Sequence, residues 1–174
     1  NPRLEDCHVL TICETLSNGA NSLVFQSNAN GCQTSLQIKD QCTSSVDGFD
    51  FLAQADLDQF ALDHPDTMHV IGNINVNGNN IIDLSALNKI KSTQGSISIH
   101  SNALLSNVNG FEALESIGHS LTLEENSKLL NTNGFHKLRS IGRDLIIETC
   151  EELISISGLS AVTHVGRDVR MQGN

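Results

Sequence analysis

The sequence has no tryptophan and no tyrosine, and aromatic residues make up only 3% of its 174 residues. It has only two prolines. A core of this chain must therefore be built from Ile, Leu and Val, which suits thin stacked layers better than a globular core of large rings. At this length the chain is sufficient for one domain with a real core.

Basic residues are also scarce. Ten Lys and Arg stand against 20 Asp and Glu, a formal net charge of −10. This charge argues against nucleic acids and anionic membrane surfaces as partners. No apolar run approaches the ~18 residues needed to span a bilayer, so no membrane insertion is expected of this segment. No Asn-x-Ser/Thr glycosylation signal occurs.

The five cysteines are unevenly distributed, since four lie in the first quarter and only Cys150 lies later. An even number in a short segment predicts two disulfides in an N-terminal cap, with the pairing left open, and favours a secreted or cell-surface protein. A reduced cytosolic cap is the alternative. Zinc is disfavoured because no close C-x-x-C pair is present. The predicted disulfide cysteines are Cys7, Cys13, Cys32 and Cys42.

One pattern recurs from Gly72 onward every 23–24 residues. In each unit a glycine precedes an apolar-x-apolar pair, the alternation of a short strand with one buried face. One unit cannot bury its apolar residues alone, but stacked units share a continuous core, as in leucine-rich-repeat-like solenoids. The prediction is a mainly β fold, a right-handed parallel β-solenoid. The glycines are Gly72, Gly95, Gly118, Gly142 and Gly166. The pairs are Ile74/Val76, Ile97/Ile99, Leu121/Leu123, Leu145/Ile147 and Val169/Met171.

Three residues after each pair stands Asn, or Cys in one repeat. At a bend between stacked units, backbone N–H and C=O groups point inward without strand partners, and a buried amide can bond to them and to the amides above and below. Cysteine is the known alternative in this position of leucine-rich repeats. The predicted structural ladder is Asn79, Asn102, Asn126, Cys150 and Asn174. Buried apolar residues are expected three positions later, at Ile82, Leu105, Leu129 and Leu153.

The expected domain is single, with a cap over 1–35, a first turn over 36–71 and regular repeats over 72–174. Val46-Asp-Gly-Phe49 matches Val108-Asn-Gly-Phe111, which makes Leu36/Ile38 the first apolar pair. The first turn then has about 14 extra residues, a predicted helix or loop insert stopped by Pro65. The face of that helix is expected to hold Phe51, Leu52, Ala55, Phe60 and Ala61.

The phrases LLSNVNGFEALESIGHSLTLEEN and LLNTNGFHKLRSIGRDLIIETC resemble the receptor L-domain family. That fold forms the ligand-binding lobes of insulin and EGF receptor ectodomains and occurs in fungal, bacterial and protist surface proteins. The segment FLAQADLDQF…MHVIGNINVNGN resembles the family's first regular turn, with Thr67-Met68-His69 where fungal members often have a cysteine. The resemblance covers about residues 36–174 and implies the fold. Because members bind different partners, no ligand-contacting residue is carried over.

Solenoids often bind ligands on the outward side chains of their strands. A solvated polar face is the alternative, because exposed aromatic anchors are lacking. The candidate ligand-binding residues are Asn75, Asn77, Ser98, His100, Thr122, Glu124, Ile146, Glu148 and Arg170.

Two acidic groups are candidate chemical sites. Glu124 and Glu148 fall one repeat apart and could bind a cation or act as the acid/base pair of a polysaccharide-cleaving enzyme. Nearby Arg143, Arg167 and Arg170 favour a salt-bridged surface instead. The insert could form a metal site, but its spacing matches no EF-hand and a solvated helix is favoured. Its candidate ligands are Asp56, Asp58, Asp63, Asp66, His64 and His69.

The function favoured by these patterns is non-catalytic recognition or adhesion outside the cell, with a protein or glycan ligand and without metal or cofactor. A structural part of a cell wall or surface layer is the first alternative, and a carbohydrate-active enzyme the second. The repeats stop in mid-turn at Asn174, which predicts that the repeat continues or that a partner covers this end, for example through self-association.

Overall fold

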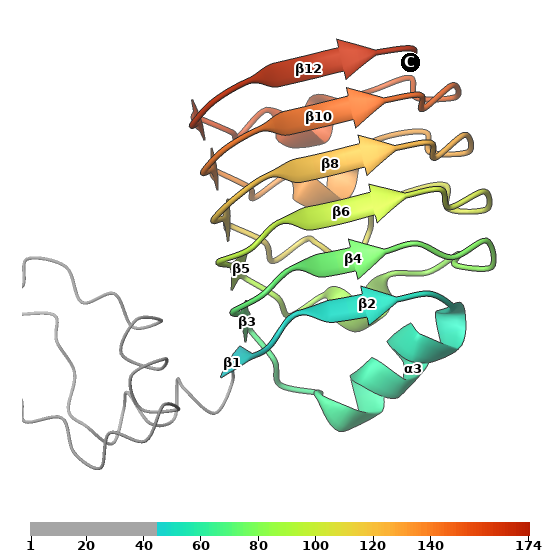
Figure 1. The fold of residues 1–174 in the computed structure, drawn as a ribbon, viewed down its shortest axis with the longest axis vertical. Helices are drawn as coiled ribbons and strands as arrows, with labels where there is room; N and C mark the ends of the chain where they lie inside the picture. Colours follow the sequence, from blue (N-terminus) through green and yellow to red (C-terminus); the bar gives the residue numbers. More distant parts are fainter. Residues whose placement is uncertain (1–44) are drawn as a thin grey trace, which may run out of the picture. The chain divides into compact units, whose positions relative to one another are not determined.

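Two parallel sheets of short strands organise residues 45–174, the part of the chain that the computed structural model describes. The chain alternates between the two sheets, and in each sheet the strands follow one another in chain order (Figure 1). The short sheet consists of β1 (Ser45–Val46), β3 (His69–Val70), β5 (Ser92–Thr93), β7 (Ser116–Ile117), β9 (Ser140–Ile141) and β11 (His164–Val165). The long sheet consists of β2 (Phe49–Phe51), β4 (Ile74–Val76), β6 (Ile97–His100), β8 (Leu121–Glu124), β10 (Leu145–Glu148) and β12 (Val169–Gln172).

The structure is therefore mainly parallel β, as the repeat pattern predicts. The predicted cap over 1–35, its four cysteines and the pair Leu36/Ile38 lie outside the described residues. Within the described part, no helix is long and apolar enough to cross a membrane.

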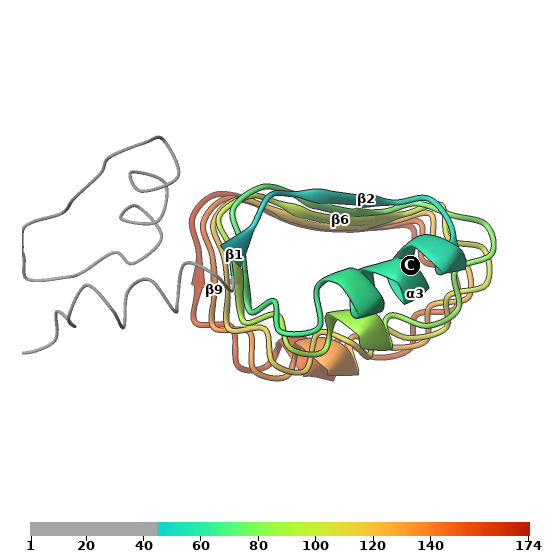
Figure 2. The ribbon, with the colours of Figure 1, turned by 90° about the horizontal axis from the view of Figure 1, so that it is seen from below.

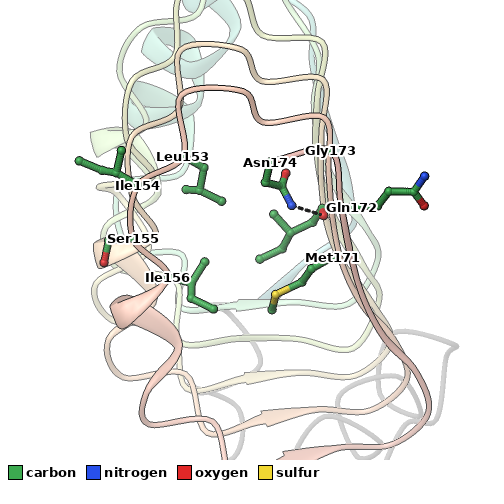
Figure 3. Close-up of a pocket in the computed structure, with 9 residues that line it drawn as sticks. Leu153, Ile154, Ser155, Ile156, Met171, Gln172, Gly173 and Asn174 are labelled. Carbon is green, nitrogen blue, oxygen red and sulfur yellow. Dashed lines mark hydrogen bonds between the residues drawn. The ribbon is translucent and has the colours of Figure 1, made fainter.

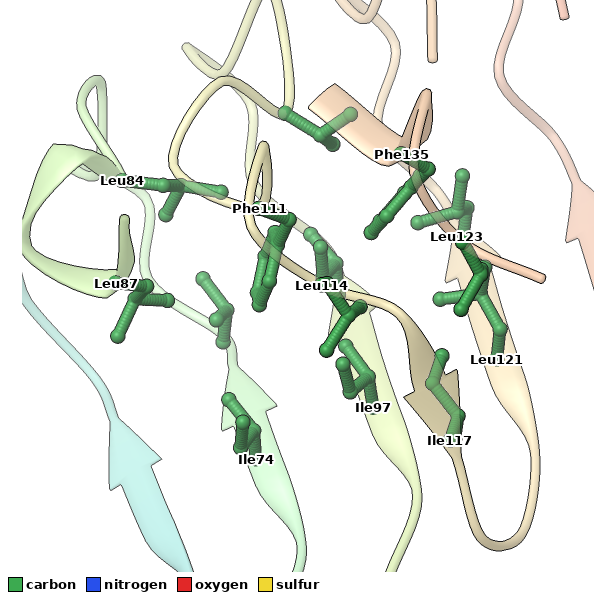
Figure 4. Packing of buried hydrophobic residues seen from close by; sticks show 14 of the residues in the cluster. Ile74, Leu84, Leu87, Ile97, Phe111, Leu114, Ile117, Leu121, Leu123 and Phe135 are labelled. Atoms are coloured by element: carbon green, nitrogen blue, oxygen red, sulfur yellow. The ribbon is translucent and has the colours of Figure 1, made fainter. Parts of the chain in front are cut away.

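Register in the long sheet places each apolar residue directly beside its counterpart in the next repeat. Ile97 pairs with Leu121 and Leu121 with Leu145, so the alternation seen in the sequence becomes a continuous inward face. Most of these side chains have no solvent exposure. Figure 4 shows these inward side chains packed against Phe111 and Phe135, which come from the opposite side of the core. The two phenylalanine rings stack with their centroids 5.4 Å apart.

The side opposite the long sheet is formed by one α-helix and three short 3-10 segments (Figure 2). Where consecutive 3-10 segments stack, their backbones nearly touch. A Cβ added to Gly158 would lie 1.8 Å from the carbonyl oxygen of Thr132, the N-cap of the preceding 3-10 segment, which explains why glycine precedes the Phe/Leu position in these repeats. The segments are α3 (Gln54–Asp63), η1 (Ser85–Leu87), η2 (Asn133–Phe135) and η3 (Ser157–Leu159).

Helix α3 begins where Asp56 accepts hydrogen bonds from the backbone N–H groups of Leu52 and Ala53, at 2.8 and 2.9 Å. It ends before Pro65, as predicted. Its buried residues are Leu57 and Phe60.

The predicted helical face is wrong in part. Phe60 is buried on the helix, but Phe51 belongs to β2, and the side chains of Leu52, Ala55 and Ala61 are exposed. The reason is that the helix starts later than its apolar residues suggest, which turns Leu57 rather than Ala61 inward with Phe60.

The predicted match between Val46–Phe49 and Val108–Phe111 is also wrong. Phe49 pairs in register with Ile74 and Phe51 with Val76, so Gly48 lies at the corner between the two sheets, beside Gly72. The first strand pair is thus Phe49/Phe51, and α3 occupies the side that 3-10 segments occupy later. The pattern Val-x-Gly-Phe occurs between the two sheets, at Val46–Phe49, and again on the side opposite the long sheet, at Val108–Phe111. The pattern alone therefore does not distinguish these two places.

At the other corner of the long sheet, Asn102, Asn126, Cys150 and Asn174 lie at equivalent bends, with hydrogen bonds from Asn102 to Asn126 and from Cys150 to Asn174, whereas Asn79 does not. Gly78 takes the position in the first complete repeat, and its N–H donates to Oδ1 of Asn102 at 2.9 Å. Asn79 is exposed. The following apolar position shifts with it, so that Ile81 is buried and Ile82 is 58% exposed.

Candidate functional site on the long-sheet face

The outward side chains of the long sheet form two in-register columns, here called the long-sheet face. Each column arises because residues between inward apolar positions point to the opposite side of the sheet. Most of these side chains are half-buried, while Asp50, Arg170 and Gln172 are exposed. The first column is Asp50, Asn75, Ser98, Thr122, Ile146 and Arg170. The second column is His100, Glu124, Glu148 and Gln172.

The structure brings together every predicted face residue except Asn77. That residue follows the last residue of β4, and its backbone N–H donates to the carbonyl oxygen of Phe51 at 2.8 Å. Sequence reasoning missed Asp50, which begins the first column and accepts a hydrogen bond from Nδ2 of Asn75 at 2.6 Å. The apolar-x-apolar triplet Phe49-Asp50-Phe51 carries the signal, but the match with Val108–Phe111 places Phe49 elsewhere and the predicted helical face includes Phe51.

The acidic pair on this face lies in register, Glu124 beside Glu148. Arg170 approaches the second carboxylate, with 3.7 Å between its Nε and Oε1 of Glu148. Neither Arg143 nor Arg167 takes part in the three ion pairs found among the described residues. The arrangement offers hydrogen-bond donors and acceptors on a flat surface rather than an acid and a base facing a cleft.

A neighbouring column at the corner between the sheets is occupied by structural contacts. Oδ1 of Asn73 accepts the N–H of Ser96 at 2.8 Å, and Oδ1 of Asp144 accepts the N–H of Asp168 at 3.3 Å. Ser120 donates its hydroxyl to Oδ2 of Asp144 at 3.1 Å. These side chains stabilise the corner and leave the two columns of the face as the surface available to a ligand.

The acidic and histidine residues of the helical segment are dispersed among structural contacts. Asp56 caps α3, Asp66 pairs with Lys89 at 2.9 Å, and the ring of His64 packs on Phe49 and Phe60 at centroid distances of 5.3 Å. In the described part of the chain, no group of three or more His, Cys, Asp or Glu is arranged to hold a metal ion.

Two titratable groups have displaced pKa values, both away from the long-sheet face. Burial, helped by the charge of Lys91, lowers the pKa of His69, whose Nδ1 lies 2.8 Å from the Ser92 hydroxyl. Burial raises the pKa of the Cys150 thiol, although hydrogen bonds from Asn126 act in the opposite direction. Burial is the largest cause of both displacements, so both reflect packing.

Comparisons with known proteins give no further assignment. A scan against models of protein families finds no match, and a search of curated proteins also finds none. The assignment of the long-sheet face as a candidate site therefore rests on the geometry described above.

Proposed function

We propose that the chain is a right-handed parallel β-solenoid of the receptor L-domain type that acts as a non-catalytic recognition or adhesion module, secreted or at the cell surface. The repeat-by-repeat register of both sheets and the Asn/Cys ladder support the assignment to this type. The module takes a protein or glycan ligand and uses no metal or cofactor.

The observation that carries this proposal is the pair of in-register columns on the long-sheet face. Inward side chains form the core, and corner side chains are held by backbone contacts, so the face is ordered before any ligand arrives. A preordered surface loses little conformational entropy on binding. The face is polar with one apolar side chain, Ile146, between Thr122 and Arg170, and its two columns present amide, hydroxyl, imidazole and carboxylate groups.

The experiment compares two double variants with the parent chain. Ser98→Arg with Thr122→Arg changes neighbours on the long-sheet face, and Ser116→Arg with Ser140→Arg changes neighbours on the short sheet. All four side chains are half-buried, so the pairs are matched in environment. Fluorescent chain is applied to a glycan array and to intact cells, with and without protease treatment of the cells.

The parent and the short-sheet variant are expected to bind alike, whereas the long-sheet variant loses binding. Binding that survives protease treatment and appears on the array identifies a glycan, and protease-sensitive binding identifies a protein. Equal binding by both variants, or no binding by the parent on any surface, contradicts the proposal.

The first alternative is a structural component of a cell wall or surface layer. A layer-forming protein assembles without an added ligand. The alternative of a carbohydrate-active enzyme depends on the register pair Glu124 and Glu148. It requires that the parent releases reducing ends from a polysaccharide and that Glu124→Gln or Glu148→Gln abolishes this release.

A further inference from the structure

Three asparagines of the described part are followed directly by glycine, a pair that is chemically labile. Glycine has no side chain to shield its backbone nitrogen, so this nitrogen can reach the side-chain carbonyl carbon of the asparagine before it. The sequence alone does not rank the three pairs, because each asparagine follows Val or Thr. The pairs are Asn77-Gly78, Asn109-Gly110 and Asn133-Gly134.

The backbone nitrogens of Gly78 and Gly110 are each held by a side chain. Gly78 donates its N–H to Oδ1 of Asn102 at 2.9 Å, within the buried ladder. Gly110 donates its N–H to Oε2 of Glu112 at 2.8 Å. A nitrogen attacks a carbonyl carbon only after it loses its proton. The hydrogen bond keeps that proton in place, and the charge of Glu112 disfavours a nitrogen anion beside it.

Gly134 lies one repeat after Gly110 but lacks this contact. The chain just before the two glycines pairs in register from repeat to repeat, so the two positions are equivalent. The side chain that follows differs, because His136 stands where Glu112 stands in the earlier repeat. Nδ1 of His136 lies 3.1 Å from the carbonyl oxygen of Asn133 instead. Among the described residues, the Gly134 nitrogen has no hydrogen-bond acceptor.

The side chain of Asn133 is exposed. Its Oδ1 accepts the hydroxyl of Ser157 from the next repeat, at a long 3.4 Å. Beside them, Asn131 and Ser155 pair in register, and Figure 3 shows Ser155 on the outer side of this wall with its hydroxyl pointing away from the core. Water therefore has access to the Asn133 amide, and ammonia can leave it.

We propose that Asn133 is the residue of the described part at which the folded chain deamidates spontaneously. The Gly134 nitrogen loses its proton and attacks Cγ of Asn133, which closes a succinimide ring. The bond from Cγ to Nδ2 breaks, and Nδ2 takes up a proton and leaves as ammonia. Water then adds to one of the two ring carbonyl groups and breaks its bond to the nitrogen. The products are aspartate and isoaspartate, formed from asparagine and water with loss of ammonia.

Ring closure requires Asn133 to rotate out of the 3-10 segment η2. One backbone bond opposes this rotation, from the nitrogen of His136 to the carbonyl oxygen of Asn133 at 3.2 Å. Short 3-10 segments have poor hydrogen-bond geometry and open locally without global unfolding. Isoaspartate lengthens the main chain beside Gly134, where even a Cβ would lie 1.9 Å from the carbonyl oxygen of Val108. The modified repeat therefore stacks less well on the one before it.

The test is peptide mapping by mass spectrometry after the folded chain has been incubated in warm, mildly alkaline buffer. Enzymatic methylation identifies isoaspartate. Asn133 is expected to convert several times faster than Asn77 and Asn109. His136→Glu should slow conversion at Asn133, because it supplies the acceptor found in the earlier repeat. His164→Glu, at an exposed histidine on the short sheet, is the matched control and should leave the rate unchanged.

The reverse exchange provides a second test. Glu112→His frees the Gly110 nitrogen and should raise the conversion rate of Asn109 toward that of Asn133. In concentrated urea the parent should convert at similar rates at all three pairs, because the contacts that separate them are lost.

Equal rates in the folded chain, or faster conversion at Asn77 or Asn109, overturn the proposal. It is also overturned if His136→Glu converts at the parent rate, or if Asn133 remains the fastest of the three in urea. The inference is independent of the proposed recognition role, because deamidation needs no ligand and occurs away from the long-sheet face.

Discussion

Asn126 accepts two hydrogen bonds from Asn102 at the corner where successive repeats leave the long sheet. Its Oδ1 lies 3.1 Å from the backbone nitrogen of Asn102 and 3.0 Å from Nδ2 of the same residue. Its own Nδ2 donates to the carbonyl oxygen of Ile99 at 2.7 Å. One buried side chain thus satisfies polar groups of the repeat before it. The same relation links Asn174 to Cys150, where Oδ1 accepts the backbone N–H at 3.0 Å.

Replacing this side chain should be costly. Asn126→Ala removes the partner of the buried backbone N–H of Asn102. It also removes one hydrogen bond each from the Asn102 amide, which keeps its bonds to Val76 and His100, and from the Ile99 carbonyl group. We therefore expect a loss of about 3 kcal/mol in the free energy of unfolding. Urea unfolding measures it. Asn88→Ala, at an exposed asparagine, is the matched control and should change stability little. A loss below about 0.5 kcal/mol for Asn126→Ala would contradict the buried ladder.

Two buried threonines should respond in opposite directions to replacement by valine. Oγ1 of Thr132 has no hydrogen-bond partner among the described residues, so Thr132→Val should raise the free energy of unfolding by about 1 kcal/mol. Oγ1 of Thr93 donates to Gly72 O at 2.6 Å and accepts from Gly95 N at 3.1 Å, so Thr93→Val should lower it by about 2 kcal/mol. Thermal and urea unfolding of the pair decide this, and an equal effect of both variants would refute the assignment.

The residue before each ladder position adopts a left-handed backbone. The φ angles are 57° at Ser101, 55° at Glu125 and 54° at Thr149, and glycine occupies the equivalent position at Gly173. Because a β-branched side chain is strained at such an angle, Thr149→Gly should stabilise the fold by about 1 kcal/mol. Thr122→Gly, within β8, should destabilise it instead. If Thr149→Gly destabilised the protein as much as Thr122→Gly, the strain argument would fail.

The Cys150 thiol should be unreactive in the folded chain. Burial raises its pKa, so the thiolate that attacks Ellman's reagent is scarce in the native state and appears when the chain unfolds. The unfolded thiol ionises first as pH rises, near its ordinary pKa of about 8.5. The group therefore contributes stability below that pH and loses it as pH rises through the higher folded pKa.

The measurement is the urea midpoint as a function of pH for the parent chain and for Cys150→Asn. The alkaline loss of stability should be smaller in the variant, which has no thiol at this position and places asparagine where asparagine stands in three other repeats. Rapid labelling of Cys150 in the native state at neutral pH, judged by mass spectrometry of the peptide that contains it, would show that the thiol is accessible.

The sequence alone determined the parts of the fold that depend on local alternation. Ile97 and Ile99, or Leu121 and Leu123, face inward because side chains alternate along a strand, and the period places them one above another. Asn102, Asn126 and Cys150 could be placed in the ladder for a related reason, since a regular repeat leaves each of them at the same bend. The two columns of the long-sheet face follow from the same alternation.

Only the tertiary structure decided where the first repeat begins and which of two adjacent residues occupies the bend after β4. Gly78 rather than Asn79 donates to Asn102, because the bend after β4 is one residue shorter than later bends. The sequence does not show this difference, since every residue of the run Asn77-Gly78-Asn79-Asn80 is polar or small. Likewise, Phe49 pairs with Ile74 because their strands share hydrogen bonds, a relation between distant segments that no local pattern encodes.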